Sequence, residues 1–255
     1  MIDTGKEILV SDVAGARWLR IARPEKKNAL TVAMYAALAD AIVAAQERDD
    51  ISAIVFAAEG STFTAGNDLA DFMRNPPADF DSPVFRFLRA IAGSSVPLIA
   101  AVPGAAIGIG TTMLLHCDFV YATPNAKFVL PFVDLGIVPE AASSLLLPQA
   151  IGHLKAAEMF YLGRPLSAAE ALAAGLIGAI VEPDELERTA TATAAALASK
   201  PRGALIASRK LVRGNRDEIE HRMRVEGDVF AERLKTPEVQ QTLAAFFQAR
   251  SKTPN

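Results

Sequence analysis

The sequence contains one cysteine, Cys117, so it can form neither an internal disulfide nor a zinc site built from several cysteines. A lone thiol also suits a reducing compartment. The three histidines, His116, His153 and His221, stand too far apart for a local metal motif, and no HExxH motif is present. We therefore expect no metal site.

The chain also has no excess of positive charge. It carries 26 Lys and Arg residues against 29 Asp and Glu residues, a net charge of −3. No global basic field recruits nucleic acid or an anionic membrane, so we expect neither as a partner. Residues 1–12 include acidic side chains and only a short apolar run, which is not the pattern of a signal or transit peptide. These features predict a cytoplasmic protein.

One uncharged run, residues 96–115, has the length of a membrane span. It contains Pro97, Pro103 and three glycines, which would interrupt the hydrogen-bond ladder of a helix repeatedly. We interpret the run as a strand, a tight turn and a buried helix.

Aromatic residues make up only 7% of the chain, whereas hydrophobic residues make up 51%. We therefore expect a core of aliphatic and small side chains, and global disorder is excluded. Apolar strand patterns start at Ile8 and Trp18 and recur at 53–58, with an amphipathic helical run at 32–48 that Thr31 can cap. This alternation predicts an α/β fold. The second half of the chain is mostly helical, and no linker divides it.

Two turns that contain glycine, at residues 63–69 and 104–110, each follow a strand pattern and lead toward a helix. The sequence GIGTTM at 108–113 lacks the third glycine of a dinucleotide fingerprint and the GK[ST] of a phosphate loop. No GxSxG elbow is present either. Small residues in such turns let a ligand approach the backbone, where free N–H groups can bind developing negative charge.

Five segments of the chain carry motifs whose order and approximate spacing are highly specific. They are RPEKKNALT (23–31), TFTAGNDL (62–69), PLIAAVPGAAIGIG (97–110), CDFVYATPNAKFVLPFVDLGIVPE (117–140) and GRPLSAAEALAAGLI (163–177). Together they resemble the crotonase, or enoyl-CoA hydratase/isomerase, superfamily over nearly the whole chain. The resemblance implies a spiral of ββα units with a helical C-terminal region used for trimerisation. One continuous domain would then consist of a core, 1–190, and an oligomerisation region, 191–255.

The same resemblance implies a substrate and a site. The substrate is an acyl-CoA thioester, with coenzyme A as part of the substrate and no separate cofactor. Its thioester oxygen would lie between two backbone N–H groups, which fall at Asn67 and Ile109. The implied assembly is a homotrimer or a dimer of trimers. Further residues expected to contact the substrate are Lys26, Lys27, Ala65, Gly66, Asp68, Leu69, Gly108, Gly110, Phe132, Phe247 and Arg250.

Two positions depart from the hydratases of this family. The resemblance places the two hydratase glutamates at Thr112 and Phe132, and neither residue can act as a general base near neutral pH. A different carboxylate, Glu140, stands where the peroxisomal type of Δ3,Δ2-enoyl-CoA isomerase has its single glutamate. The resemblance therefore favours an isomerase over a hydratase.

One carboxylate is sufficient for this isomerisation because no water is consumed. Removing a proton from C2 and returning one to C4 moves the double bond, through a dienolate whose charge gathers on the thioester oxygen. We therefore expect a Δ3,Δ2-enoyl-CoA isomerase with Glu140 as the base. The apolar and small neighbours of Glu140 are expected to raise its pKa toward the working pH.

The sequence leaves several alternatives open. The runner-up enzyme is an enoyl-CoA hydratase, followed by a dienoyl-CoA isomerase, a decarboxylase or a dehalogenase; the other class is a homologue that binds acyl-CoA or a protein partner without turnover. Asp134 is the rival base, Glu140 could be an acidic residue in the first turn of a helix, and Asp68 could be a helix cap. His116 and Cys117 are expected to be buried structural residues. The acyl pocket is expected to include Phe72, Met73, Phe80, Phe85 and Leu88.

Overall fold

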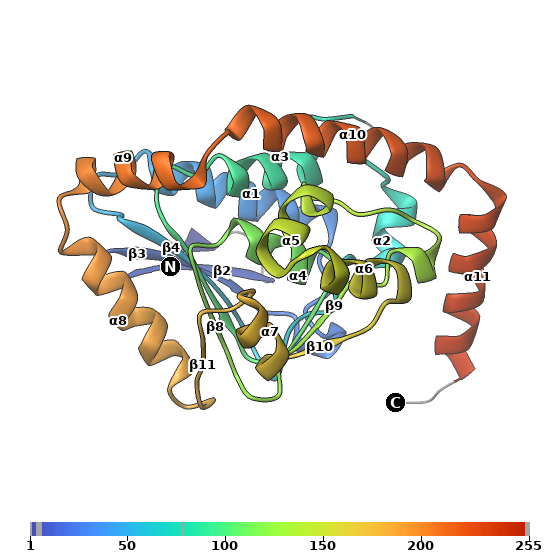
Figure 1. Ribbon diagram of the computed structural model, residues 1–255, viewed down its shortest axis with the longest axis horizontal. Helices are drawn as coiled ribbons and strands as arrows, with labels where there is room; N and C mark the ends of the chain where they lie inside the picture. The colour runs from blue at the N-terminus through green and yellow to red at the C-terminus, as the bar shows by residue number, and fades with distance from the viewer. Residues whose placement is uncertain (1, 4–6, 78, 253–255) are drawn as a thin grey trace.

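The computed structural model describes residues 2–3, 7–77 and 79–252 and shows two β-sheets with helices packed around them (Figure 1). The larger sheet has the strand order β1-β2-β3-β4-β6-β8-β11. Strands β1 to β3 pair antiparallel, whereas β3, β4, β6, β8 and β11 run parallel. The bounds are β1 (Ile2–Asp3), β2 (Ile8–Val13), β3 (Ala16–Ile21), β4 (Ala53–Ala58), β6 (Leu98–Val102), β8 (Phe119–Ala122) and β11 (Ala179–Ile180).

The smaller sheet has the order β10-β9-β7-β5, in which β5, β7 and β9 run parallel. Each of the pairs β4/β5, β6/β7 and β8/β9 sends its first strand to the larger sheet and its second to the smaller one, and helices follow each pair. This repetition confirms the predicted α/β class and gives the ββα units that the resemblance implied. The remaining bounds are β5 (Thr62–Thr64), β7 (Ala105–Ile107), β9 (Lys127–Val129) and β10 (Leu166–Ser167).

Several helices begin where the sequence supplies a cap or a proline. Thr31 Oγ1 accepts the Met34 N–H at 3.3 Å, and Ser167 caps a later helix in the same way. The α-helices are α1 (Val32–Gln46), α2 (Leu69–Arg74), α3 (Pro83–Ala92), α4 (Ile109–Thr112), α5 (Ser143–Ile151), α6 (His153–Leu162), α7 (Ala168–Ala174), α8 (Leu186–Ala198), α9 (Arg202–Arg213), α10 (Arg216–Leu234) and α11 (Pro237–Lys252). Short 3₁₀ turns are η1 (Pro24–Lys26), η2 (Met113–His116) and η3 (Val133–Leu135).

The larger sheet buries both of its faces. Strand side chains alternate, so Leu19 points into the main core with α1 and α3, whereas Trp18 points to the opposite face. On that face α8 packs Leu186 and Ala190 against the sheet. The expected boundary at residues 190 and 191 falls within α8.

The uncharged run at 96–115 forms β6, β7, α4 and most of η2, as predicted. Among the described residues no helix is long and apolar enough to cross a membrane. The sequence did not single out α5 or α10. In Figure 1, α10 lies across α3 and α5, so the C-terminal part of the chain closes over segments from its first two thirds.

Candidate active site

Three parallel strands of the smaller sheet deliver the candidate site. The register pairs Thr64 of β5 with Ala106 of β7, and Ala106 with Phe128 of β9. The segments that follow the carboxyl ends of these strands contain Asn67, Ile109 and Glu140. Ligands of α/β proteins commonly bind at the carboxyl ends of parallel strands. The strand order therefore places the segments that carry these three residues after neighbouring strand ends of one sheet.

The first turn presents the backbone of Asn67. Leu30 N–H donates to Gly66 O and Asp68 N–H donates to Leu30 O, both at 2.8 Å, and this bridge leaves the Asn67 N–H between them unused. Gly66 has a φ of +87°, and a Cβ there would lie 3.0 Å from Ile107 O of the second turn. Only glycine permits this left-handed backbone at so close an approach.

The second turn presents the backbone of Ile109. Ile109 is the first residue of α4, so its N–H has no acceptor within the helix. Gly108 precedes it with a φ of +56° and fixes the turn by donating its N–H to Val129 O at 2.9 Å. Within the described part of the chain, neither the Asn67 nor the Ile109 N–H donates a hydrogen bond, so both can donate to a ligand oxygen.

Glu140 precedes a tight turn at the start of α5. Although the residue as a whole is only partly buried, its Oε1 is enclosed, and no described residue makes a hydrogen bond to it. Burial raises the pKa of Glu140 to about 8, and the negative charge of Glu226 adds to the shift. A carboxyl group poised near neutral pH and without a partner is suited to accept and return a proton.

An apolar pocket ends at Glu140. Three of the five residues expected in an acyl pocket, Phe72, Phe85 and Leu88, line it, whereas Met73 is 43% exposed and Phe80 stacks on Phe85 from outside the lining. The other lining residues are Pro77, Val84, Ala141, Met223, Glu226, Gly227 and Phe230.

Glu226 of α10 is the site residue that sequence reasoning missed. Its carboxylate oxygens accept the backbone N–H groups of Ala142 at 2.7 Å and Ser144 at 2.9 Å. A signal was present in the sequence, because Met223 and Phe230 lie three and four residues away and place Glu226 within an apolar helical stripe.

Tyr35 of α1 connects the first turn with Glu140. It is 1% exposed, and its hydroxyl donates a hydrogen bond to Asn67 Oδ1. Burial raises the pKa of Tyr35 well above its usual value, and the charge of Glu140 raises it further. The phenol therefore stays protonated and fixes the side chain of Asn67.

The predicted contact residues of the two turns lie together. Ala65, Gly66, Asp68 and Leu69 flank Asn67, and Gly108 and Gly110 flank Ile109. Asp68 caps α2, accepting the N–H groups of Ala70 and Asp71 at 3.1 Å, so the cap interpretation is confirmed. Its carboxylate also pairs with Arg23 at 2.8 Å. Lys26 and Lys27 lie on an exposed loop that adjoins the first turn, because the Ala65 N–H donates to Lys27 O at 2.9 Å.

Two other candidates, Phe132 and Asp134, are not among the described residues that line the pocket. Phe132 is 3% exposed and stacks on Phe160 of α6 with ring centroids 6.4 Å apart, so it is a packing residue here and not a lining one. Asp134, the rival base, is exposed on η3. The backbones of Phe247 and Arg250 lie in α11, but their side chains fall outside the described part of the chain.

The hydratase position at Thr112 is enclosed. Thr112 is 0% exposed, and its hydroxyl makes no hydrogen bond among the described residues. Burial lowers the pKa of His116, four residues later, to about 4, which keeps the ring neutral. In residues 2–3, 7–77 and 79–252 no group of three His, Cys, Asp or Glu side chains could hold a metal ion.

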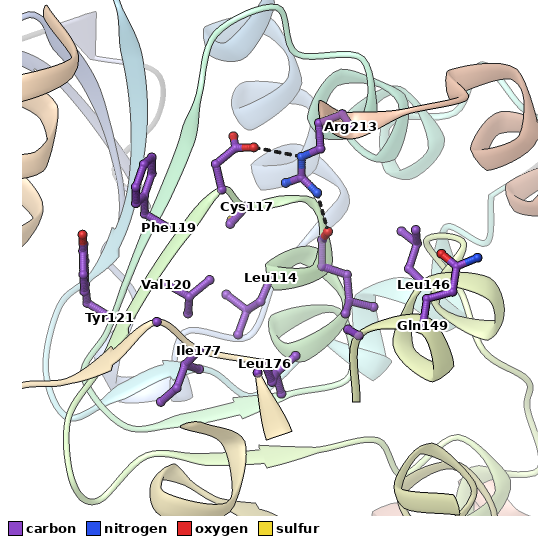
Figure 2. Close-up of a pocket in the computed structure, with 15 residues that line it drawn as sticks. Leu114, Cys117, Phe119, Val120, Tyr121, Leu146, Gln149, Leu176, Ile177 and Arg213 are labelled. Carbon is purple, nitrogen blue, oxygen red and sulfur yellow. Dashed lines mark hydrogen bonds and ion pairs between the residues drawn. The ribbon is translucent and has the colours of Figure 1, made fainter. Parts of the chain in front are cut away.

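Figure 2 shows a second pocket, whose lining does not include Glu140. It lies between β8, α5 and residues 175–178, with Arg213 at its rim. Arg213 Nε pairs with Asp118 at 2.9 Å and Nη1 donates to Leu115 O at 2.9 Å, so these contacts attach α9 to the edge of the sheet. The pocket contains no unpaired acid or base suited to proton transfer among its described residues.

Comparisons with known proteins show which family the chain belongs to. Over 85% of this chain and 56% of the other protein, the sequence is 36% identical to enoyl-CoA delta isomerase 2 of Rattus norvegicus. The human protein of the same name is 33% identical over 98% of this chain and 65% of its own length. The chain thus spans between about half and two thirds of these two relatives.

A solved structure covers almost the whole chain. An enoyl-CoA hydratase/isomerase from Pseudoalteromonas atlantica T6c is 44% identical and superposes with a TM-score of 0.92, over 98% of this chain and 99% of that one. The fold is therefore the crotonase fold that the sequence motifs indicated. Residues 13–253 match the Enoyl-CoA hydratase/isomerase family. The chain belongs to the enoyl-CoA hydratase/isomerase family.

Proposed function

We propose that this chain is a Δ3,Δ2-enoyl-CoA isomerase. The observation that carries the proposal is Glu140, which lines an apolar pocket and whose enclosed Oε1 has no partner among the described residues. The substrate we propose is a 3-enoyl-CoA thioester, with its acyl chain in the pocket and its thioester oxygen between the Asn67 and Ile109 N–H groups. The two mammalian relatives are named enoyl-CoA delta isomerase 2, which supports the proposal.

The reaction needs one base and one anion site. Glu140 takes a proton from C2, the electron pair moves into a dienolate, and the thioester oxygen becomes negative. The two N–H donors stabilise that oxygen, each by about 10²- to 10³-fold in rate. Protonated Glu140 then returns a proton to C4, so the double bond ends between C2 and C3 and the carboxylate is regenerated.

Hydration of the double bond would need a second carboxylate to activate water. Thr112 and Phe132 stand at the expected positions, and both are buried without a titratable group. Glu226 lines the same pocket, but each of its oxygens already accepts a backbone N–H. Isomerisation by one free carboxylate is therefore favoured over hydration.

The test compares Glu140→Gln with wild type on purified protein. Gln keeps the size of the side chain but cannot accept the C2 proton, so we expect isomerisation of 3-enoyl-CoA to fall by about 10² to 10⁴ with little change in acyl-CoA affinity. A substrate with deuterium at C2 should carry part of the label to C4 in the wild-type product.

Asp134→Asn is the matched control, because it removes a carboxylate from the exposed face of the same segment. This variant should keep most of the activity. Wild-type turnover in Glu140→Gln would refute the proposed base. Formation of 3-hydroxyacyl-CoA from 2-enoyl-CoA would instead identify a hydratase, and absence of turnover with retained binding would identify a non-catalytic homologue.

A further inference from the structure

The turn that carries Glu140 has an unfavourable backbone. Ala141 and Ala142, the two residues after Glu140, have φ angles of +62° and +56°. For residues with a Cβ this left-handed region is unfavourable, because the Cβ lies too close to the following carbonyl oxygen. Ala142 is also the N-cap residue of α5, and its methyl group cannot accept the helix N–H groups. The turn therefore needs support from elsewhere in the chain.

Glu226 supplies that support from α10. The residue is 6% exposed, and its two oxygens accept the N–H groups of Ala142 and Ser144, one oxygen each. The carboxylate thus replaces the missing N-cap of α5 from 84 residues away. Two charge-assisted hydrogen bonds fix the backbone immediately after Glu140.

A second buried side chain also contacts the turn. His116 Nε2 lies 2.8 Å from Ala141 O, and because a carbonyl oxygen only accepts, Nε2 donates. His116 is 2% exposed and uncharged at neutral pH. The turn is therefore held by both the Glu226 carboxylate and a neutral donor.

We propose that Glu226 is a positioning residue for the reaction: it holds, from α10, the turn that presents Glu140, and it places a fixed negative charge beside that base. The inference rests on the proposed role of Glu140. It does not make Glu226 a second acid or base, because both of its oxygens are occupied. Both carboxylates line the same pocket, so the charge of Glu226 favours the protonated form of Glu140.

The titratable groups around the turn come from three elements. Glu226 faces it from α10, Tyr35 from α1 and His116 from η2, and Arg222 of α10 acts on Glu226. Burial raises the pKa of Glu226, whereas its hydrogen bonds from Ser144 and Ala142 oppose that shift. With Tyr35 protonated and His116 neutral, Glu226 is the one charge in this set that acts directly on Glu140.

The test is the pH profile of kcat/KM for Glu226→Gln. Without the negative charge, Glu140 should ionise more readily, so the acidic limb should move toward lower pH by on the order of one unit. Loss of one hydrogen bond to the turn should lower kcat by about tenfold to a hundredfold, with KM within about threefold. Asp228→Asn, which removes a charge from the exposed face of the same helix, should leave both quantities unchanged.

Glu226→Asp separates the effect of the negative charge from the effect of the hydrogen bonds to the turn. It keeps the carboxylate but shortens the side chain by one methylene. Its kcat should fall while its acidic limb stays at the wild-type pH. Unchanged kcat in Glu226→Asp would overturn the proposal, even if Glu226→Gln failed to fold. A Glu226→Gln enzyme with lower thermal stability but wild-type kcat and pH profile would also overturn it, since a purely structural cap predicts that result.

Titration of Glu140 by carbon-13 NMR in the free protein gives a readout that does not depend on turnover. Comparison with Glu140→Gln assigns the signal, and its midpoint should fall in Glu226→Gln. If Glu140→Gln kept its activity, the proposed function would fail, yet this titration would still decide the inference. If Glu226→Gln left both the Glu140 midpoint and kcat unchanged, the positioning role of Glu226 would be rejected. The proposed function of Glu140 would then still stand.

Discussion

At the scale of single residues, the raised pKa of Glu140 makes stability depend on pH. Its pKa is raised to about 8 in the folded protein, whereas its ordinary value is 4.5. Between these two values the folded protein holds more protons than the unfolded chain, so stability falls as pH rises from 4.5 through 8. The ionised base therefore costs the fold an amount on the order of a few kcal/mol at pH 8.5.

Glu140→Gln should remove this cost, because the amide does not ionise. We expect the free energy of unfolding of the variant, relative to wild type, to increase by a few kcal/mol between pH 5 and pH 8.5. Urea unfolding at the two pH values measures it. An identical difference at both would show that Glu140 has an ordinary pKa.

His116 should give a pH dependence of the opposite sign. Burial lowers its pKa from 6.5 to about 4, so the unfolded chain binds a proton more readily than the folded protein in this interval. Stability contributed by His116 is therefore lost as pH falls from 6.5 to 4, by about 3 kcal/mol in total. His116→Gln keeps a donor for Ala141 O and does not titrate, so it should lose less stability between pH 7 and pH 4.5 in urea unfolding. Equal acid sensitivity of both proteins would contradict the prediction.

The sequence can predict a site residue when its role depends on neighbours in the sequence. Asn67 and Ile109 follow from short motifs at the ends of strands, and Glu140 follows from a short motif with proline before it. Glu226 accepts a hydrogen bond from Ala142, 84 residues earlier in the chain. The residues around Glu226 in the sequence therefore do not indicate its role. The apolar stripe of α10 marks its position as buried, but only the fold shows what its carboxylate contacts.

At the scale of elements, α3 and α10 set the width of the apolar pocket. Phe85 of α3 lines it, and a Cβ at Gly227 of α10 would lie 2.8 Å from the far end of the Phe85 ring. Gly227→Ala should therefore push this ring toward the pocket, whereas Phe85→Ala should open it. We expect opposite shifts in chain-length preference, toward shorter acyl chains for Gly227→Ala and longer ones for Phe85→Ala.

Measurement of kcat/KM on a series of acyl-CoA thioesters of increasing length tests this pair. Met73→Ala, at an exposed position of α2 outside the pocket lining, is the control and should keep the wild-type preference. Equal losses at every chain length in both pocket variants would show that Phe85 only packs the core.

The sequence indicated α7 but not α5, and the two helices differ in which residues accept or donate the hydrogen bonds at their ends. α7 is bounded by Ser167 and Gly175, which cap it with local hydrogen bonds. α5 has Pro148 in its interior and Ala142 at its N-cap, both of which argue against a helix when only neighbours in sequence are considered. Glu226 caps it from another helix, because its carboxylate accepts the N–H groups of Ala142 and Ser144.

At the scale of the whole molecule, α9 displays apolar side chains that this chain does not cover. Leu211 and Val212 are 83% and 84% exposed, which is unfavourable in water unless a partner buries them. From the family resemblance and this surface we expect a homotrimer or a dimer of trimers, and we expect α9 to contribute to its interface.

Sedimentation velocity at micromolar concentration tests the assembly. The double variant Leu211→Asp and Val212→Asp should shift the protein toward smaller species, because two carboxylates cannot be buried in an apolar contact. Ser208→Asp, at another exposed position of α9, should change the distribution less. A wild-type protein that sediments as a monomer would disprove the expected oligomer.

Glu140 and Glu226 lie far apart in the sequence, so they are translated at different times. Glu226 is made 86 residues after Glu140, which at ordinary rates of translation is a delay of roughly 4 to 17 seconds. During that interval the nascent chain already contains Asn67, Ile109 and Glu140, but the turn after Glu140 lacks its cap. Under the roles proposed for Glu140 and Glu226, we expect chains on the ribosome to turn over acyl-CoA about tenfold to a hundredfold more slowly until α10 has emerged and docked.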